Sequence, residues 1–154
     1  MAKNTRSTSF SLDPADLDHL ESRVGTGENR SVRLALDLDS YYSLLALGLA
    51  RAKRRLNQAE AKLILDVQNG TLVDGSQLSL WLSGGLAHQV GDGIALDGLD
   101  KKWGVDGVSL TEKINAMSDI EVVGVLDWAA HFWRGNVQAD DAVEKAVADF
   151  LEDR

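Results

Sequence analysis

The order of segments over residues 6–49 is the feature that most constrains how this chain folds. Residues 6–12 alternate between small hydroxyl side chains and larger ones, so that Thr8, Phe10 and Leu12 share one face of an extended backbone. A period of two is the pattern of a half-buried strand. The sequence therefore predicts a short strand at the N-terminus.

A helix is predicted directly after this strand. Asp13 is suited to cap the helix, and Pro14 is suited to its first position. Gly25 and Gly27 end the helix after Val24 and turn the chain.

A longer helix is predicted next, capped by Asn29 or Ser31. Its apolar stripe has steps of about four residues. The stripe consists of Leu34, Leu38, Tyr41, Leu45, Leu49 and Ala52. Residues 32–38 also alternate strictly and, taken alone, fit a strand, but the apolar pattern that continues to Leu56 favours a helix.

The rest of the chain is predicted to be helical, with a loop rich in Gly and Asp over residues 91–107. Capping boxes at Asn57–Glu60 and Ser118–Glu121 mark two helix starts. Helices are expected over residues 57–69, 76–90, 109–117, 118–133 and 140–151. The helix over residues 118–133 carries Val122, Val125, Leu126, Ala129, Phe132 and Trp133 at helical spacing, with Val125, Ala129, Phe132 and Trp133 on one face. The predicted fold is mainly α: a strand-helix-helix unit over residues 1–56, followed by an acidic all-helical domain over residues 57–154.

Charge is distributed unevenly between these two parts. The whole chain carries a net charge of −8, whereas residues 1–56 hold nine Lys/Arg and seven Asp/Glu. Two interpretations stay open: two functions on one chain, or an acidic surface that keeps the protein in solution. The chain has no cysteine, no apolar run of membrane-spanning length and no apolar signal segment near Met1, so we expect a soluble, cytoplasmic protein without a membrane partner.

The residues Ser9-Phe-Ser-Leu12, Pro14 and Asn29-Arg-Ser-Val32 resemble the ribbon-helix-helix DNA-binding proteins of the Arc/MetJ type. The resemblance implies a homodimer in which two N-terminal strands pair and lie in the major groove of double-stranded DNA, above four helices. It also implies the contact residues. They are Arg6, Ser7, Ser9, Ser11, Gly27, Asn29, Arg30 and Ser31. Because serine discriminates weakly between bases, phosphate contacts are expected to dominate.

Other candidate sites are few. No catalytic arrangement of histidines and no nucleophile motif is present, so we predict no enzyme activity. Four aspartates, at positions 92, 97, 100 and 106, do not have the spacing of a calcium loop, and neither metal nor cofactor is predicted. Arg51, Lys53, Arg54 and Arg55 fit either nucleic-acid contact or favourable charge at a helix C-terminus.

Four tryptophans also have two interpretations. Trp81, Trp103, Trp128 and Trp133 are expected to anchor the C-terminal core, with partner binding as the alternative.

The sequence supports two hypotheses of function. The first is a homodimeric DNA-binding transcriptional regulator whose residues 57–154 bind a protein partner or oligomerise. The alternative is an acidic protein-interaction module, of the kind that phage-encoded inhibitors exemplify, that does not bind DNA.

Overall fold

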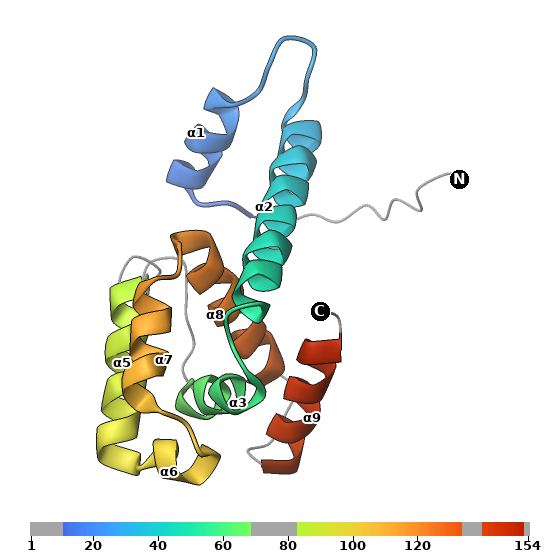
Figure 1. The fold of residues 1–154 in the computed structure, drawn as a ribbon. Coiled ribbons are helices and arrows are strands. Elements are labelled where there is room, and N and C mark those ends of the chain that lie inside the picture. The colour runs from blue at the N-terminus through green and yellow to red at the C-terminus, as the bar shows by residue number, and fades with distance from the viewer. Residues whose placement is uncertain (1–10, 69–82, 134–139, 153–154) are drawn as a thin grey trace. The chain divides into compact units, whose positions relative to one another are not determined.

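A computed structural model describes residues 11–68, 83–133 and 140–152 (Figure 1). Its helices, in chain order, are α1 (Pro14–Ser22), α2 (Arg30–Lys53), α3 (Gln58–Val67), α5 (Ser83–Asp97), α6 (Leu99–Trp103), α7 (Gly107–Asn115), α8 (Asp119–Trp133) and α9 (Asp140–Glu152). The chain divides into two compact units between Tyr41 and Tyr42, inside α2. The sequence placed a domain boundary after Leu56 instead, just beyond the end of that helix. We call Met1–Tyr41 the N-terminal unit and Tyr42–Arg154 the C-terminal unit.

The prediction of a ribbon-helix-helix fold is wrong, because the described residues contain helices and turns but no strand. Ser11 and Leu12, the part of the predicted strand that is described, form irregular backbone leading into α1. Residues 6–10 lie outside the described residues. A strand needs a neighbouring strand to satisfy its backbone N–H and C=O groups, and the pairing predicted here requires a second copy of the chain. The fold is all-α, so the predicted helical character is confirmed.

Local capping fixes the start of α1 as the sequence predicted. The Asp13 carboxylate accepts a hydrogen bond from the backbone N–H of Asp16 at 2.9 Å, and Pro14 is the first helical residue. The turn after α1 passes through Gly27, whose φ of 81° is in the left-handed region that favours glycine. Asn29 then caps α2 by accepting from the N–H of Val32 at 3.0 Å.

Helix α2 settles the ambiguity over residues 32–38, which are helical. Leucine and alanine dominate this stretch and favour a helix, and nothing interrupts it before Lys53. The predicted stripe is only partly buried: Leu45 and Ala52 are covered, whereas Leu38 and Tyr41 remain exposed.

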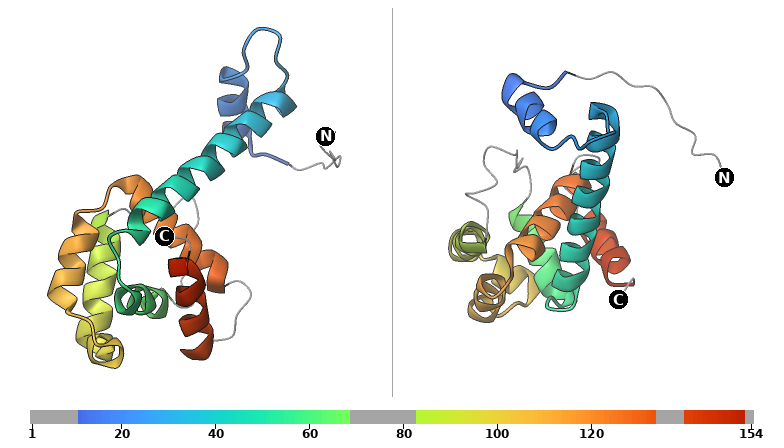
Figure 2. Two further views of the ribbon diagram at one scale, coloured as in Figure 1. Left: turned by 45° about the vertical axis from the view of Figure 1, so that its right-hand side comes forward. Right: turned by 90° about the horizontal axis from the view of Figure 1, so that it is seen from above.

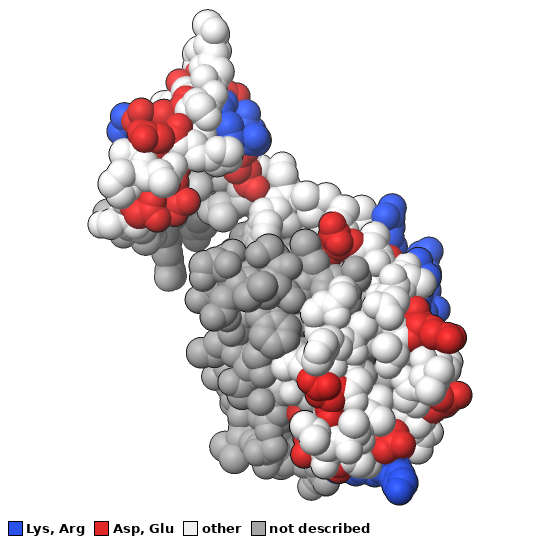
Figure 3. Space-filling view, turned by 90° about the vertical axis from the view of Figure 1, so that its left-hand side faces the viewer, with Lys and Arg blue, Asp and Glu red and all other residues white. Residues whose placement is uncertain are grey.

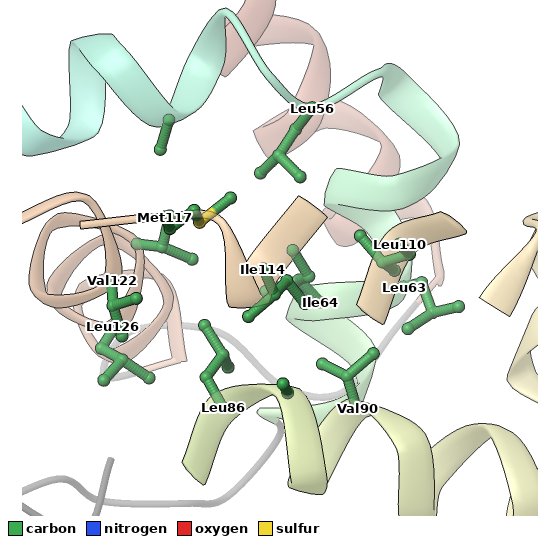
Figure 4. Packing of buried hydrophobic residues seen from close by; sticks show 13 residues of the cluster. Leu56, Leu63, Ile64, Leu86, Val90, Leu110, Ile114, Met117, Val122 and Leu126 are labelled. Atoms are coloured by element: carbon green, nitrogen blue, oxygen red, sulfur yellow. The ribbon is translucent and has the colours of Figure 1, made fainter. Parts of the chain in front are cut away.

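The C-terminal unit contains the main hydrophobic core, to which α3, α5, α7 and α8 all contribute (Figure 4). Helices α5 and α7 lie side by side, as Figures 1 and 2 show. A second cluster joins α3, α8 and α9 through Ala61, Leu65, Ala129, Val143 and Val147. Among the described residues, this core is therefore built by helices that pack through their apolar sides.

The predicted tryptophan anchors are described in part. Trp103 packs against both clusters, and Trp128 and Phe132 pack against the second. Val125 and Ala129, predicted on the same helical face, are buried. Trp81 and the side chain of Trp133 lie outside the described residues, so their assignment stays a prediction.

The loop predicted over residues 91–107 is largely helical, and that prediction is wrong. Helix α5 continues through Gly91 and Gly93 to Asp97, and α6 follows. Ile94 packs against the main core, which compensates for the low helix propensity of the glycines. Within this stretch, the sequence predicted a short turn near Leu99–Trp103, which corresponds to α6.

The capping box at α3 is confirmed, and at α8 the structure shows the half in which Glu121 accepts from Ser118. Asn57 and Glu60 exchange hydrogen bonds of 2.8 and 2.9 Å at the start of α3. At α8, the N–H and hydroxyl of Ser118 both donate to the Glu121 carboxylate, at 2.7 and 2.9 Å.

Glu121 also receives a charged hydrogen bond from Arg55, whose Nε lies 2.7 Å from Oε1. Burial raises the pKa of Glu121, but the hydrogen bonds from Arg55 and Ser118 outweigh it, and the pKa lies below its ordinary value. The ionised form is therefore more stable in the folded than in the unfolded chain.

This difference predicts acid sensitivity. The stabilisation is fully present above the ordinary pKa of glutamate, about 4.3, and is lost as the pH falls through the lowered folded-state pKa. Melting curves of the protein and of Glu121→Gln, taken from neutral to acidic pH, should converge below about pH 4. Glu112→Gln, at an exposed position, is the control and should follow the unmodified protein throughout. A constant gap between Glu121→Gln and the unmodified protein would contradict this role.

Candidate interaction surface

The residues predicted to contact DNA are only partly described. Arg6, Ser7 and Ser9 lie outside the described residues, and Ser11 is exposed just before α1. Gly27, Asn29, Arg30 and Ser31 come together at the N-terminus of α2. There the Asn29 side chain caps the helix, and Arg30 and Ser31 occupy its first two positions. Their role in DNA binding stays a prediction.

Arginines of the N-terminal unit are engaged by carboxylates. Arg23 forms a bidentate pair with Asp37, with N···O distances of 2.7 and 2.9 Å, and this pair ties the end of α1 to α2. The hydrogen bond from Arg23 is the largest influence on Asp37 and holds the pKa of that carboxyl below its ordinary value. Arg33 lies 3.2 Å from Asp37, and Arg30 pairs with Glu21.

Acidic side chains are left in excess on this unit. Residues 11–41 hold seven Asp/Glu and three Arg, a net charge of −4. Among the residues described, Asp13, Asp16, Asp18 and Asp39 form no ion pair. Figure 3 shows acidic side chains, with basic ones beside them, on the side of this unit that α1 forms. The net charge of residues 11–41 is thus opposite to that of a typical phosphate-binding surface.

Large apolar side chains are exposed on the same unit. Leu20 is the one large apolar residue buried within the described part of it. The exposed ones are Leu12, Val32, Leu36, Leu38 and Tyr41. We call this set the exposed apolar residues of the N-terminal unit; by helical spacing, Val32 and Leu36 lie on one side of α2 and Leu38 and Tyr41 on the other. A unit this small buries little surface, which is a usual reason for exposed apolar residues to meet a partner.

A shallow groove of about 250 Å³ lies between α1 and the first turns of α2. It is lined by Leu12, Leu17, Leu20, Arg30, Ser31 and Leu34. The one cation in the lining, Arg30, is paired with Glu21.

The sequence reasoning missed Val32 and Leu36 because it assigned a single stripe to α2. Because successive residues of an α-helix are rotated by about 100°, Val32 and Leu36 project from a different side of α2 than Leu34 and Leu45. The signal was present: Val32, Leu34, Leu36 and Leu38 alternate, which places apolar residues on more than one side of a helix. A helix with apolar residues all round is normally covered on all sides.

In the C-terminal unit, α2 exposes Tyr42, Leu44 and Leu47. Its last turn carries Arg51 and Lys53, which is the favourable position for cations, and Arg55 pairs with Glu121. These contacts support the helix-terminus interpretation of the basic cluster.

In the part of the chain that the structure describes, no group of three or more His, Asp or Glu is arranged to hold a metal ion. No helix there is long and apolar enough to cross a membrane.

Comparison of the chain with known protein families, with curated proteins and with solved structures gave no match. The resemblance in the first third of the sequence thus stays untested by relatives.

Proposed function

We propose that this chain is an acidic protein-interaction module that binds another protein through the exposed apolar residues of its N-terminal unit and does not bind DNA. The observation that carries this proposal is the combination of five exposed large apolar residues with a single buried one in residues 11–41. Such a ratio fits a surface that is completed by association.

Electrostatics supports a protein partner over DNA. A DNA-binding surface needs cations that displace the counterions of phosphates. The described arginines of this unit are instead paired with Glu21, Glu28 and Asp37. For the predicted interaction through residues 57–154, the exposed large apolar residues of the described part, Leu96, Val108 and Ile120, lie one each on α5, α7 and α8 and so offer less support than the set on α2.

Affinity capture with the full-length protein as bait tests the proposal. Leu36 is 44% exposed on α2, so Leu36→Ser removes apolar contact surface at little cost to folding. We expect a stoichiometric protein partner that the unmodified protein retains and that Leu36→Ser loses at least tenfold, a change of about 1.4 kcal/mol. Val108→Ser, at a 72% exposed position of the C-terminal unit, is the matched control and should retain the partner.

A second measurement addresses DNA. A fluorescently labelled DNA duplex should show no binding when the protein is present at micromolar concentration and the salt is about 50 mM. Electrostatic contacts are strong at this salt concentration. Sub-micromolar binding that weakens steeply with salt would overturn the proposal and favour the DNA-binding regulator.

A further inference from the structure

The groove between α1 and α2 is of a size to hold individual side chains of a protein partner. Its volume of about 250 Å³ is below the range of roughly 300–1,000 Å³ that is typical of small-molecule pockets. Its walls are mainly leucine, and it opens beside the exposed Leu12. It therefore fits one or two apolar anchors of a larger partner.

The geometry of the neighbouring backbone favours a helix as that partner. An added strand needs an exposed sheet edge, and the described part of the N-terminal unit has only helices and turns. A groove between two helices is the usual site for the apolar face of a third.

Charge determines which helix fits. The one charged lining residue, Arg30, is paired with Glu21. The exposed Asp13 and Asp16 adjoin the lining residues Leu12 and Leu17 in sequence. A second copy of this chain would bring the same net charge of −4 on residues 11–41, so like charges would meet. A partner with Lys or Arg beside its apolar residues would complement the rim instead.

We infer that this groove binds the apolar face of a basic amphipathic helix supplied by the partner protein. This inference rests on the proposed function and names the chemistry of the partner at the groove, which shares Leu12 with the exposed apolar residues. The leucines give contact area, and the carboxylates select against acidic or self-association partners.

The probe is a synthetic helical peptide of about 18 residues, with Leu on one face and Lys on the other, titrated into the full-length protein and followed by fluorescence anisotropy. We expect micromolar binding that weakens at high salt. A peptide with the same Leu positions and Glu in place of Lys should bind at least tenfold more weakly.

Two variants of matched chemistry locate the site. Leu12→Lys places a cation at the groove, at a position outside any helix, and should weaken binding of the Lys peptide at least tenfold. Leu96→Lys makes the same change on α5 at an 83% exposed position and should leave binding unchanged.

Besides a failure of the Lys peptide to bind, three results would overturn the inference. The first is equal binding of the Glu peptide, and the second is an equal loss of binding in both lysine variants. The third is a micromolar dimer in sedimentation that Leu12→Lys dissociates, because a second copy would then occupy the groove. If the Lys peptide fails to bind while capture of the partner still depends on Leu36, the inference fails and the proposed function stands. Duplex binding overturns the proposed function whatever the peptide does.

Discussion

Replacing Gly48 by alanine is expected to lower the free energy of unfolding by about 3 kcal/mol or more, because α2 and α8 cross with their backbones in contact at this residue. A Cβ at Gly48 would overlap the carbonyl oxygen of Ile120 and lie 2.7 Å from its carbonyl carbon. From the other side, a Cβ at Gly124 would lie 2.5 Å from the backbone nitrogen of Leu49. Backbone atoms cannot rotate away as a side chain can, so the two helices must separate and lose packing around the buried Leu45 and Val125.

Thermal melting measures this effect. For a chain of this length each kcal/mol corresponds to roughly 2–4 °C, so Gly48→Ala should melt about 6–12 °C lower. Gly91→Ala is the matched control, since it also lies inside a helix but a Cβ there would have nothing within 4 Å. It should melt at the same temperature or slightly higher, because alanine favours a helix by about 0.5–1 kcal/mol over glycine. An unchanged melt for Gly48→Ala would show that α2 and α8 do not cross at this point.

Helix starts could be predicted from the sequence because their determinants are local. Asp13 before Pro14 and Asn57 three residues before Glu60 satisfy backbone N–H groups within one turn, whatever the rest of the chain does. Apolar spacing likewise identified α8 and its buried residues Val122, Val125 and Ala129. These features depend on no contact distant in the sequence.

The prediction of a strand was wrong because a strand, unlike a helix start, depends on a partner distant in the sequence or in another chain. Alternation over residues 6–12 describes which side chains would share a face, but a strand exists only where another strand pairs with it. The prediction of a loop after Val90 was wrong for the same reason. The helical state of this glycine-rich stretch depends on packing against α7, where Ile94 lies against Gly107. The close crossing at Gly48 and Gly124 joins residues far apart in the chain, and nothing in either local pattern indicates it.

The candidate site shows what charge counting leaves out. Residues 1–56 are slightly basic in total, which favoured DNA. The structure shows that Arg30 is paired with Glu21 and that Arg23 is paired with Asp37, and Lys3 and Arg6 lie outside the described residues. The number of cations was predictable, whereas their pairing depends on how the turn brings α1 against α2.

The core of the C-terminal unit leads to the second large expected effect, at Ile114 on α7. Its side chain is fully buried, at 0% exposure, and packs in the main cluster with residues of α3, α5 and α8. Ile114→Ala removes three carbon atoms from a site enclosed by Leu63, Leu86 and their neighbours, which can collapse only in part (Figure 4). We expect a loss of about 2–5 kcal/mol in the free energy of unfolding.

Urea denaturation measures the loss as a lower midpoint with an unchanged slope. Val108→Ala is the control, since Val108 is on the same helix and 72% exposed. Its effect should stay within about 0.5 kcal/mol. If Ile114→Ala matched this control, α7 would not pack against α3 and α5 as described. If Ile114→Ala instead lowered the slope together with the midpoint, the folded state would already be partly open without Ile114, because the slope scales with the surface exposed on unfolding.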